Sequence, residues 1–161
     1  MKTFEDDEKT KFVHIYCNTL NNLIIIPCGE SSKSKLKRVH IEIDAVSKVN
    51  YPYDENELEE TLFRSMELCH SKEPDVESKQ SIIERELGIS GYNKATKKLV
   101  RKKLKRILFQ WNNIEGYSIR PLCRGYLEKH IILLGKNIEQ GQLAEAVKKT
   151  INLKQKWFLN K

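Results

Sequence analysis

The sequence lacks the features of membrane and exported proteins. Its longest uncharged apolar run, Leu23 to Ile26, is far shorter than the ~20 residues that span a bilayer. This excludes a transmembrane protein. The N-terminus carries acidic residues, Glu5 to Glu8, where a signal peptide needs an apolar stretch. We therefore expect a cytoplasmic protein with no membrane partner.

The sequence also lacks paired cysteines. Metal ribbons and redox motifs need two thiols on one short turn, and no C-x-x-C occurs among the four cysteines, Cys17, Cys28, Cys69 and Cys123. Scattered cysteines of this kind are typical of buried, reduced thiols in a cytosolic protein. We predict no metal site.

Motifs for catalysis are absent as well. The chain contains no phosphate-binding glycine loop, zinc-hydrolase helix or nucleophile elbow. None of the four histidines, His14, His40, His70 and His130, has a second His, Cys or acid at i+3 or i+4 on an obvious shared helix face. The acidic residues Glu55, Glu57, Glu59 and Glu60 crowd the start of a predicted helix, where its dipole stabilises them. We predict a binding module rather than an enzyme, with no catalytic residue and no cofactor.

What is present is the composition of one ordinary domain. The 161 residues are 39% apolar and 32% charged, which predicts a single globular domain over 1–161. The formal net charge of +7 favours an anionic partner. Nucleic acid, an acidic protein surface and a role in solubility alone all fit this charge.

An internal similarity organises the chain. A shift of 94 positions aligns 13–18 with 107–112 without gaps, and the alignment continues through Pro27 and Pro121. Asn18 and Asn112 are identical in it, as are Ile25 and Ile119. Each aligned block alternates apolar and polar residues on both sides of a short turn, which predicts a β-hairpin.

A third β-rich segment and a helix follow each hairpin. The segment 39–43 resembles 129–133, so that His40 and His130 would occupy equivalent strand positions. Asp54 is the expected N-cap of a first helix with an apolar stripe from Leu58 to Cys69, and Asn137 or Gln140 that of a second, with a stripe from Leu143 to Ile151. We predict an α+β fold of two layers: an antiparallel sheet built from two β-β-β-α repeats, about 11–70 and 104–154, with the helices packed on it. The linker, 71–103, is expected to be partly helical, with a short helix ending before Gly88.

A basic tract suggests one function. Eight cations lie within the thirteen residues 94–106, and a line of phosphates is an obvious counter-charge. The tract has no interleaved aromatic residues to stack bases, and a solvated helix end leading into a strand would carry similar charges. A nucleic-acid-binding module that uses 94–106 is therefore the alternative prediction.

The second half carries a family resemblance in four short phrases. They are Gly91–Lys97, Ile107–Trp111, Glu115–Pro121 and Gln142–Val147. In these phrases the sequence resembles the CdiI immunity proteins of bacterial contact-dependent growth inhibition systems, over Gly91 to Leu153. The first half has no matching phrases of its own and is connected to this family only through the internal repeat.

The resemblance implies a cytoplasmic protein that binds and neutralises the C-terminal toxin domain of a cognate CdiA exoprotein. Such toxins are often nucleases, and a toxin β-hairpin can add to the sheet of the immunity protein. Because the chain is +7, we expect it to meet an acidic surface of the toxin rather than to mimic nucleic acid. The expected contacts are Lys102, Lys103, Arg106, Arg120, Arg124 and Tyr126, and contact with nucleic acid is expected only through the toxin.

Overall fold

A computed structural model describes residues 10–31, 40–76, 80–88, 98, 104–122 and 130–153. The first half contains β1 (Lys11–Cys17), β2 (Leu23–Glu30), β3 (His40–Glu42), β4 (Ser47–Val49) and α1 (Glu55–Glu67). The rest contains α2 (Ile82–Glu86), β5 (Lys105–Asn112), β6 (Gly116–Pro121), β7 (Ile132–Gly135) and α4 (Gln142–Ile151). Both predicted hairpins and all three predicted helices are present within these ranges.

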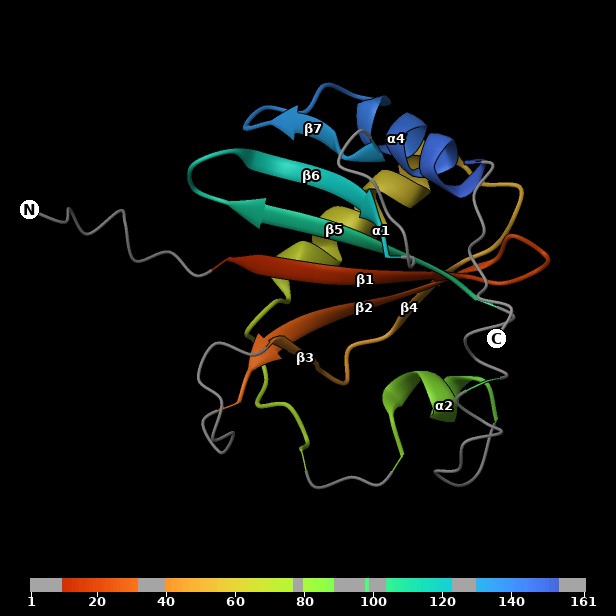
Figure 1. Cartoon of the computed structure of the whole chain (residues 1–161), viewed down its shortest axis with the longest axis vertical. Coiled ribbons are helices and arrows are strands. Elements are labelled where there is room, and N and C mark those ends of the chain that lie inside the picture. Colours follow the sequence, from red (N-terminus) through yellow and green to blue (C-terminus); the bar gives the residue numbers. More distant parts are fainter. Residues whose placement is uncertain are drawn as a thin grey trace, which may run out of the picture.

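All the strands belong to one antiparallel sheet. Its order is β3-β2-β1-β5-β6-β7, and β4 also pairs with β2. In the first hairpin Val13 pairs with Pro27, and in the second Ile107 pairs with Pro121, so the register is the same under the 94-residue shift. Strands β1 and β5 pair in the middle of the sheet. Their hairpin turns consequently lie at opposite ends of the molecule (Figure 1).

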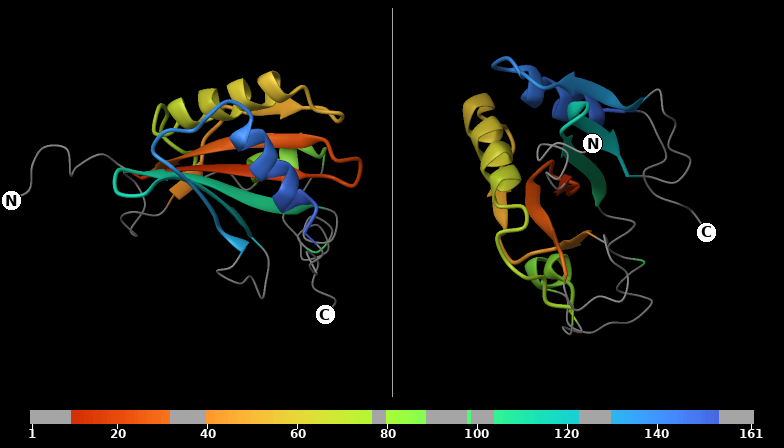
Figure 2. Two further views of the ribbon diagram at one scale, coloured as in Figure 1. Left: turned by 90° about the horizontal axis from the view of Figure 1, so that it is seen from above. Right: turned by 90° about the vertical axis from the view of Figure 1, so that its left-hand side faces the viewer.

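Two helices cover one face of the sheet. Alternate residues of the central strands, including Val13, Ile15, Ile107 and Phe109, form a fully buried core with apolar residues of α1 and α4. Figure 2 shows the sheet as one layer and these two helices beside it. The predicted stripes supply this core through Leu58, Leu62 and Met66 of α1 and Leu143, Val147 and Ile151 of α4. The α+β prediction is confirmed at this level.

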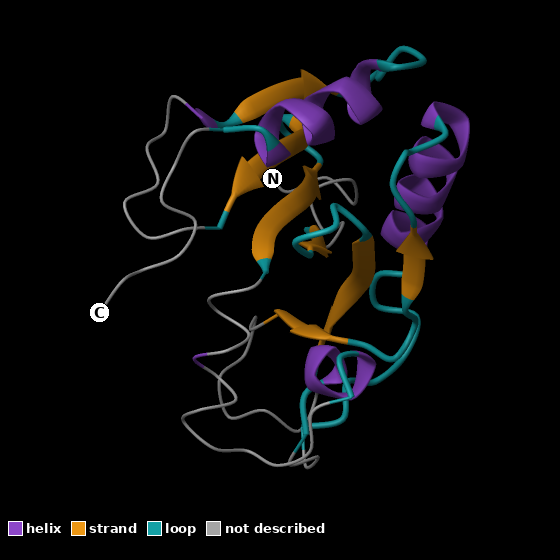
Figure 3. Ribbon diagram, turned by 90° about the vertical axis from the view of Figure 1, so that its right-hand side faces the viewer, coloured by secondary structure: helices purple, strands orange, loops and turns teal. Residues whose placement is uncertain are grey.

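The other face of the sheet meets α2, and we call it the α2 face. Its side chains are those that alternate with the core positions: Phe12, His14 and Tyr16 of β1, Ile24, Ile26 and Cys28 of β2, Arg106, Leu108 and Gln110 of β5, and Ser118 and Arg120 of β6. Tyr16 and Ile26 pack there against Ile83 of α2 and Leu104. Figure 3 shows α2 well apart from α1 and α4.

The N-cap predicted for α1 is confirmed, and the one predicted for α4 is wrong. Asp54 accepts a hydrogen bond from the Glu57 N–H, and Ser81 caps α2 in the same way. Helix α4 begins after Gly141, not after Asn137 or Gln140, and Gly141 has no side chain to cap it. Its cap is the carboxylate of Glu59. The sequence places Glu59 at the start of its own helix, and the structure adds a second role, because Glu59 is buried against α4.

The third strand of each half also differs from the prediction. Strand β7 begins at Ile132, and His130 precedes it, so His40 and His130 do not occupy equivalent strand positions. Strand β4 takes the place that corresponds to β7. It pairs with Leu23 to Ile25 of β2, and β7 pairs with the equivalent residues of β6. Segment 39–43 instead yields β3, which pairs with the later part of β2. The similarity between 39–43 and 129–133 is one of composition.

The predicted linker is described in part. Residues 71–76 form neither helix nor strand, and α2 ends before Gly88, whose φ of 67° is left-handed. The remainder of the segment 89–103, apart from Lys98, lies outside the described residues. Across the described ranges, no helix has the length and apolar character that crossing a membrane requires.

Candidate partner-binding face

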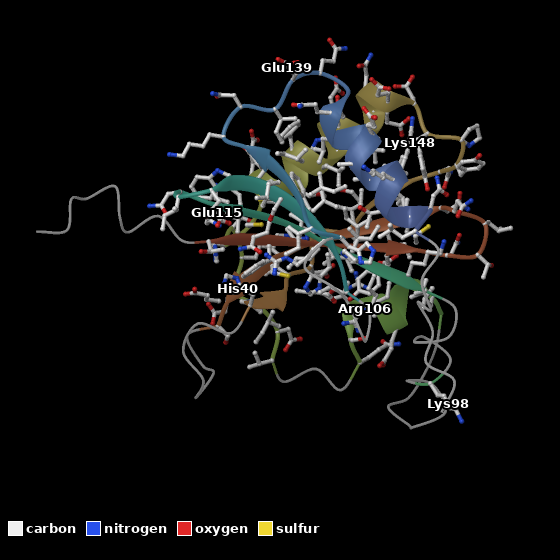
Figure 4. The ribbon with its side chains drawn as sticks, turned by 45° about the horizontal axis from the view of Figure 1, so that its top comes forward. His40, Lys98, Arg106, Glu115, Glu139 and Lys148 are labelled. Atoms are coloured by element: carbon white, nitrogen blue, oxygen red, sulfur yellow. The ribbon has the colours of Figure 1, made fainter. Side chains whose placement is uncertain are left out.

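Two of the predicted contact residues lie together on the α2 face. Arg106 of β5 is exposed, and Arg120 of β6 is half-buried. Leu108 pairs directly with Arg120, and Arg106 is two residues before Leu108. The two arginines are therefore diagonal neighbours, a relation in which Cα atoms lie roughly 7–8 Å apart and long side chains can meet. Figure 4 labels Arg106 on β5, with Lys98 farther out.

A hydrogen-bonded cluster lies next to Arg106 on the same face. The Glu42 carboxylate accepts from the Tyr16 hydroxyl at 2.5 Å and lies 2.8 Å from His14 Nδ1, both through Oε2. Tyr16 pairs with Arg106 across β1 and β5. Burial, followed by the charge of Glu42, raises the pKa of Tyr16 well above its usual value. The hydroxyl therefore stays protonated and remains a donor to Glu42.

Neither arginine has a carboxylate partner in the described part of the chain. The nearby carboxylate of Glu42 is already bound to Tyr16 and His14. The Nε of Arg120 is buried and has no hydrogen-bond partner. By contrast, Arg85 of α2 binds Asp44 through both terminal nitrogens, at 2.8 and 2.7 Å. The α2 face thus presents two guanidinium groups whose counter-charge is not supplied by the described residues.

The other four predicted contacts lie outside the described residues: Lys102, Lys103, Arg124 and Tyr126. Within the basic tract, the described members are Lys98, which is exposed, Lys105 and Arg106. The Lys105 ammonium donates to the carbonyl of Ile151 at the end of α4, at 2.8 Å, where a cation is favourable. Because β5 alternates, Lys105 and Arg106 point to opposite faces, and the end of the tract is not one continuous basic stripe.

The sheet ends at β7 on the side of the arginines. No further strand pairs with β7 among the residues described. Leu133 is paired with Ser118, which puts its side chain on the α2 face, and it is 66% exposed. The opposite edge of the sheet is divided between β3 and β4, of three residues each. Short edge strands of that kind offer little backbone for pairing.

A cavity of about 460 Å³ adjoins the cluster of Glu42. Its walls come from β3, residues 72–76 and the start of α2, and Glu42 lines it. Asp44 and Arg85 form an ion pair at its margin, and the hydrogen bond from Arg85 lowers the pKa of Asp44. Both partners are largely exposed to solvent, so the pair adds little stability.

The buried cysteines and the histidines are possible metal ligands by residue type. No group of three potential ligands occurs in the described ranges. Cys17, Cys28 and Cys69 are buried free thiols, as predicted, and Cys123 is outside the described residues. Sequence reasoning missed the pair of His14 and Glu42, because strand pairing joins residues 28 positions apart. The alternation of β1, which points His14 and Tyr16 the same way, was the only signal available.

No protein-family model matches the chain, and no curated protein matches it significantly. The resemblance to CdiI immunity proteins stays a prediction from the sequence phrases.

Proposed function

We propose that this chain is an immunity protein that binds the C-terminal toxin domain of a cognate CdiA exoprotein in the cytoplasm and blocks it. The resemblance over Gly91 to Leu153 provides the identity of the partner. The observation that carries the proposal is the edge strand β7 with its exposed Leu133. A free edge can accept a strand from a partner through main-chain hydrogen bonds, with nearby side chains providing specificity.

The choice of β7 over the other edge follows from the strands themselves. Strand β7 is continuous over four residues, whereas β3 and β4 are separate. Strand β6, which carries Arg120, lies directly beside β7. An added strand at β7 would therefore lie next to an apolar side chain and a cationic side chain, a combination typical of the centre of protein interfaces.

A toxicity assay tests this function. The toxin domain encoded beside this chain is expressed in a sensitive cell, alone and together with the full chain. The account predicts that wild type restores growth and that Leu133→Asp does not, because a charge on an edge strand opposes pairing. Leu20→Asp is the matched control, since Leu20 is 71% exposed on the β1–β2 turn, and it should protect like wild type. Growth arrest with wild type would contradict the proposal, and full protection by Leu133→Asp would contradict the choice of edge.

The alternative function is nucleic-acid binding through the basic tract 94–106. The exposed Lys98 and Arg106 favour it. It predicts binding to any duplex, with an affinity that falls steeply as salt rises. An immunity protein should instead bind one protein tightly, and duplex DNA and tRNA weakly.

We further infer that the two halves are copies of one β-β-β-α unit. The common hairpin registers support this inference. One turn contact also recurs: Asn18 Oδ1 accepts from the N–H of Leu20, and Asn112 Oδ1 from that of Ile114, two residues further on in each case. In this interpretation β4, rather than 39–43, is the counterpart of β7. Replacing either asparagine with alanine should lower the free energy of unfolding by a similar amount, about 1 kcal/mol. Strongly unequal losses would count against equivalent turns.

A further inference from the structure

We propose that Arg106 and Arg120 form one binding site on the α2 face for carboxylate side chains of the partner protein. This inference rests on the proposed function and goes beyond it, because it assigns the chemistry of the contact and the two residues that make it. The site is separate from the backbone edge of β7 and lies on the neighbouring strands β5 and β6.

Arg120 lacks a counter-charge among the described residues. A guanidinium group has five N–H donors and no acceptor. Arg120 is half-buried, and its buried Nε has no hydrogen-bond partner in the described part of the chain. A partly desolvated charge without a partner is unfavourable, and an anion from outside would remove that cost. The pairing of Arg85 with Asp44 shows how an arginine of this chain is satisfied when a carboxylate is within reach.

Glu42 does not serve as the counter-ion of Arg106. Its carboxylate binds the hydroxyl of Tyr16, the residue that pairs with Arg106 across β1 and β5. The hydrogen bonds to Tyr16 and His14 hold its Oε2 at 2.5 and 2.8 Å. Glu42 is therefore fixed towards β1, and the Arg106 guanidinium stays exposed to solvent. The Glu42 carboxylate is thus bound to His14 and Tyr16, and no ion pair joins it to Arg106 among the described residues.

Arg106 and Arg120 lie close enough on neighbouring strands to bind the same ligand. Diagonal neighbours on an antiparallel pair lie roughly 7–8 Å apart at Cα, which lets both guanidinium groups approach one carboxylate or two adjacent ones. Leu108 lies between them, paired with Arg120, and Leu133 follows on β7. The described surface is thus two cations with apolar side chains, bordered by the acidic Glu42.

This combination of cationic and apolar side chains favours a protein ligand over a nucleic acid. Arginine beside apolar residues is characteristic of the buried part of protein interfaces, and its planar fork matches a carboxylate with two parallel hydrogen bonds. Nucleic-acid interfaces are more uniformly positive and commonly add aromatic stacking. On the α2 face the aromatic residue closest to Arg106, Tyr16, is buried. We therefore assign the site to Asp or Glu side chains of the toxin domain.

The test is calorimetric titration of the full chain with the toxin domain, using wild type, Arg106→Gln, Arg120→Gln and Arg120→Lys. The matched control is Arg64→Gln, because Arg64 is an exposed arginine on α1, which covers the other face. We expect a loss of affinity of about 10- to 100-fold for each glutamine variant and a change below about twofold for the control. The lysine variant should also lose affinity, because an ammonium cannot form the two parallel bonds.

Each outcome has a distinct meaning. If wild type does not bind the toxin domain, the proposed function fails. If it binds, and the α2-face variants bind equally well or the control loses as much, only the arginine site is overturned. Duplex DNA and tRNA are titrated in parallel, and loss of their binding alone in the arginine variants would assign the site to phosphate and overturn the inference. Thermal unfolding verifies that each variant folds, and the exposed Arg106 carries the test if Arg120→Gln does not fold.

Discussion

Glu59 of α1 caps the N-terminus of α4 at Leu143. Its carboxylate accepts from the Leu143 N–H at 3.0 Å, and also from the N–H groups of Gly141 and Ala144, at 2.8 and 3.1 Å. The first turn of α4 has no cap of its own, because Gly141 precedes it. One buried carboxylate therefore joins the helices of the two halves and satisfies donors that would otherwise be orphaned.

Replacing Glu59 with alanine should destabilise the whole domain. The change removes an N-cap and leaves buried N–H groups without acceptors, so we expect the free energy of unfolding to fall by about 2–3 kcal/mol. Glu60→Ala is the control, because the neighbouring Glu60 is exposed and should change stability by less than about 0.5 kcal/mol. Urea unfolding of both variants measures the difference. Equal stability of the two would show that the cap is energetically unimportant.

Gly116 should not tolerate a side chain. Its φ is +79°, and a Cβ there would lie 2.3 Å from the carbonyl oxygen of Gly135 on β7. Both the strain and the overlap with backbone oppose Gly116→Ala, and we expect a loss of at least about 3 kcal/mol. Gly88→Ala separates these effects, since Gly88 has φ +67° and open space around it. It should cost only about 1–2 kcal/mol. Thermal unfolding curves in which the two variants match would contradict this account of β6 and β7.

The buried thiols should make the protein sensitive to alkali. Burial raises the pKa of Cys28, so the folded state keeps a neutral thiol where the unfolded chain ionises at about 8.5. Because the folded pKa is raised, this contribution to stability is complete below pH 8.5 and is lost as the pH rises. Between pH 8.5 and pH 10 the loss from Cys28 should be about 2 kcal/mol.

The measurement is the free energy of unfolding of wild type and Cys28→Ala at pH 7 and pH 10. The variant should be less stable at pH 7, because it leaves a cavity, but should lose about 2 kcal/mol less than wild type on going to pH 10. Parallel pH dependence of the two proteins would mean that Cys28 does not stay neutral.

The hydrogen bond between Tyr16 and Glu42 should be measurable as a coupling. A double-mutant cycle of Tyr16→Phe and Glu42→Gln isolates this hydrogen bond. For a part-buried bond to a carboxylate, the coupling energy should be about 1.5–3 kcal/mol. Tyr51→Phe serves as the control, because Tyr51 is exposed and should be nearly neutral. A coupling energy near zero would contradict the claim that this hydrogen bond holds Glu42 in place against β1.

Local patterns predicted much of this fold, because the elements that they describe bury alternating or helical stripes. The spacing of Leu58 and Leu62 located α1, and the alternation around Phe109 located β5. The tie between Glu59 and α4 could not be predicted, since it joins residues 82 to 85 positions apart. The third strands were assigned less well, because three- and four-residue strands contain too few alternations to fix a register.

Only part of the candidate site could be predicted from the sequence. Arg106 and Arg120 were identified from charge and position, and strand pairing brings them to one face. Their missing counter-ion depends on where Glu42 is held, which is set by three-dimensional contacts with His14 and Tyr16. Lys105, adjacent in sequence and equally basic, points to the other face and binds the end of α4.

The most direct test of the account is calorimetric titration of the full chain with the C-terminal domain of the exoprotein encoded beside it, together with an assay of the toxin's activity. The account predicts saturable binding to that domain, loss of toxin activity at equal concentrations, and little heat with duplex DNA or tRNA. Binding to nucleic acid alone, weakening as salt rises, would contradict it and make the basic tract the functional feature.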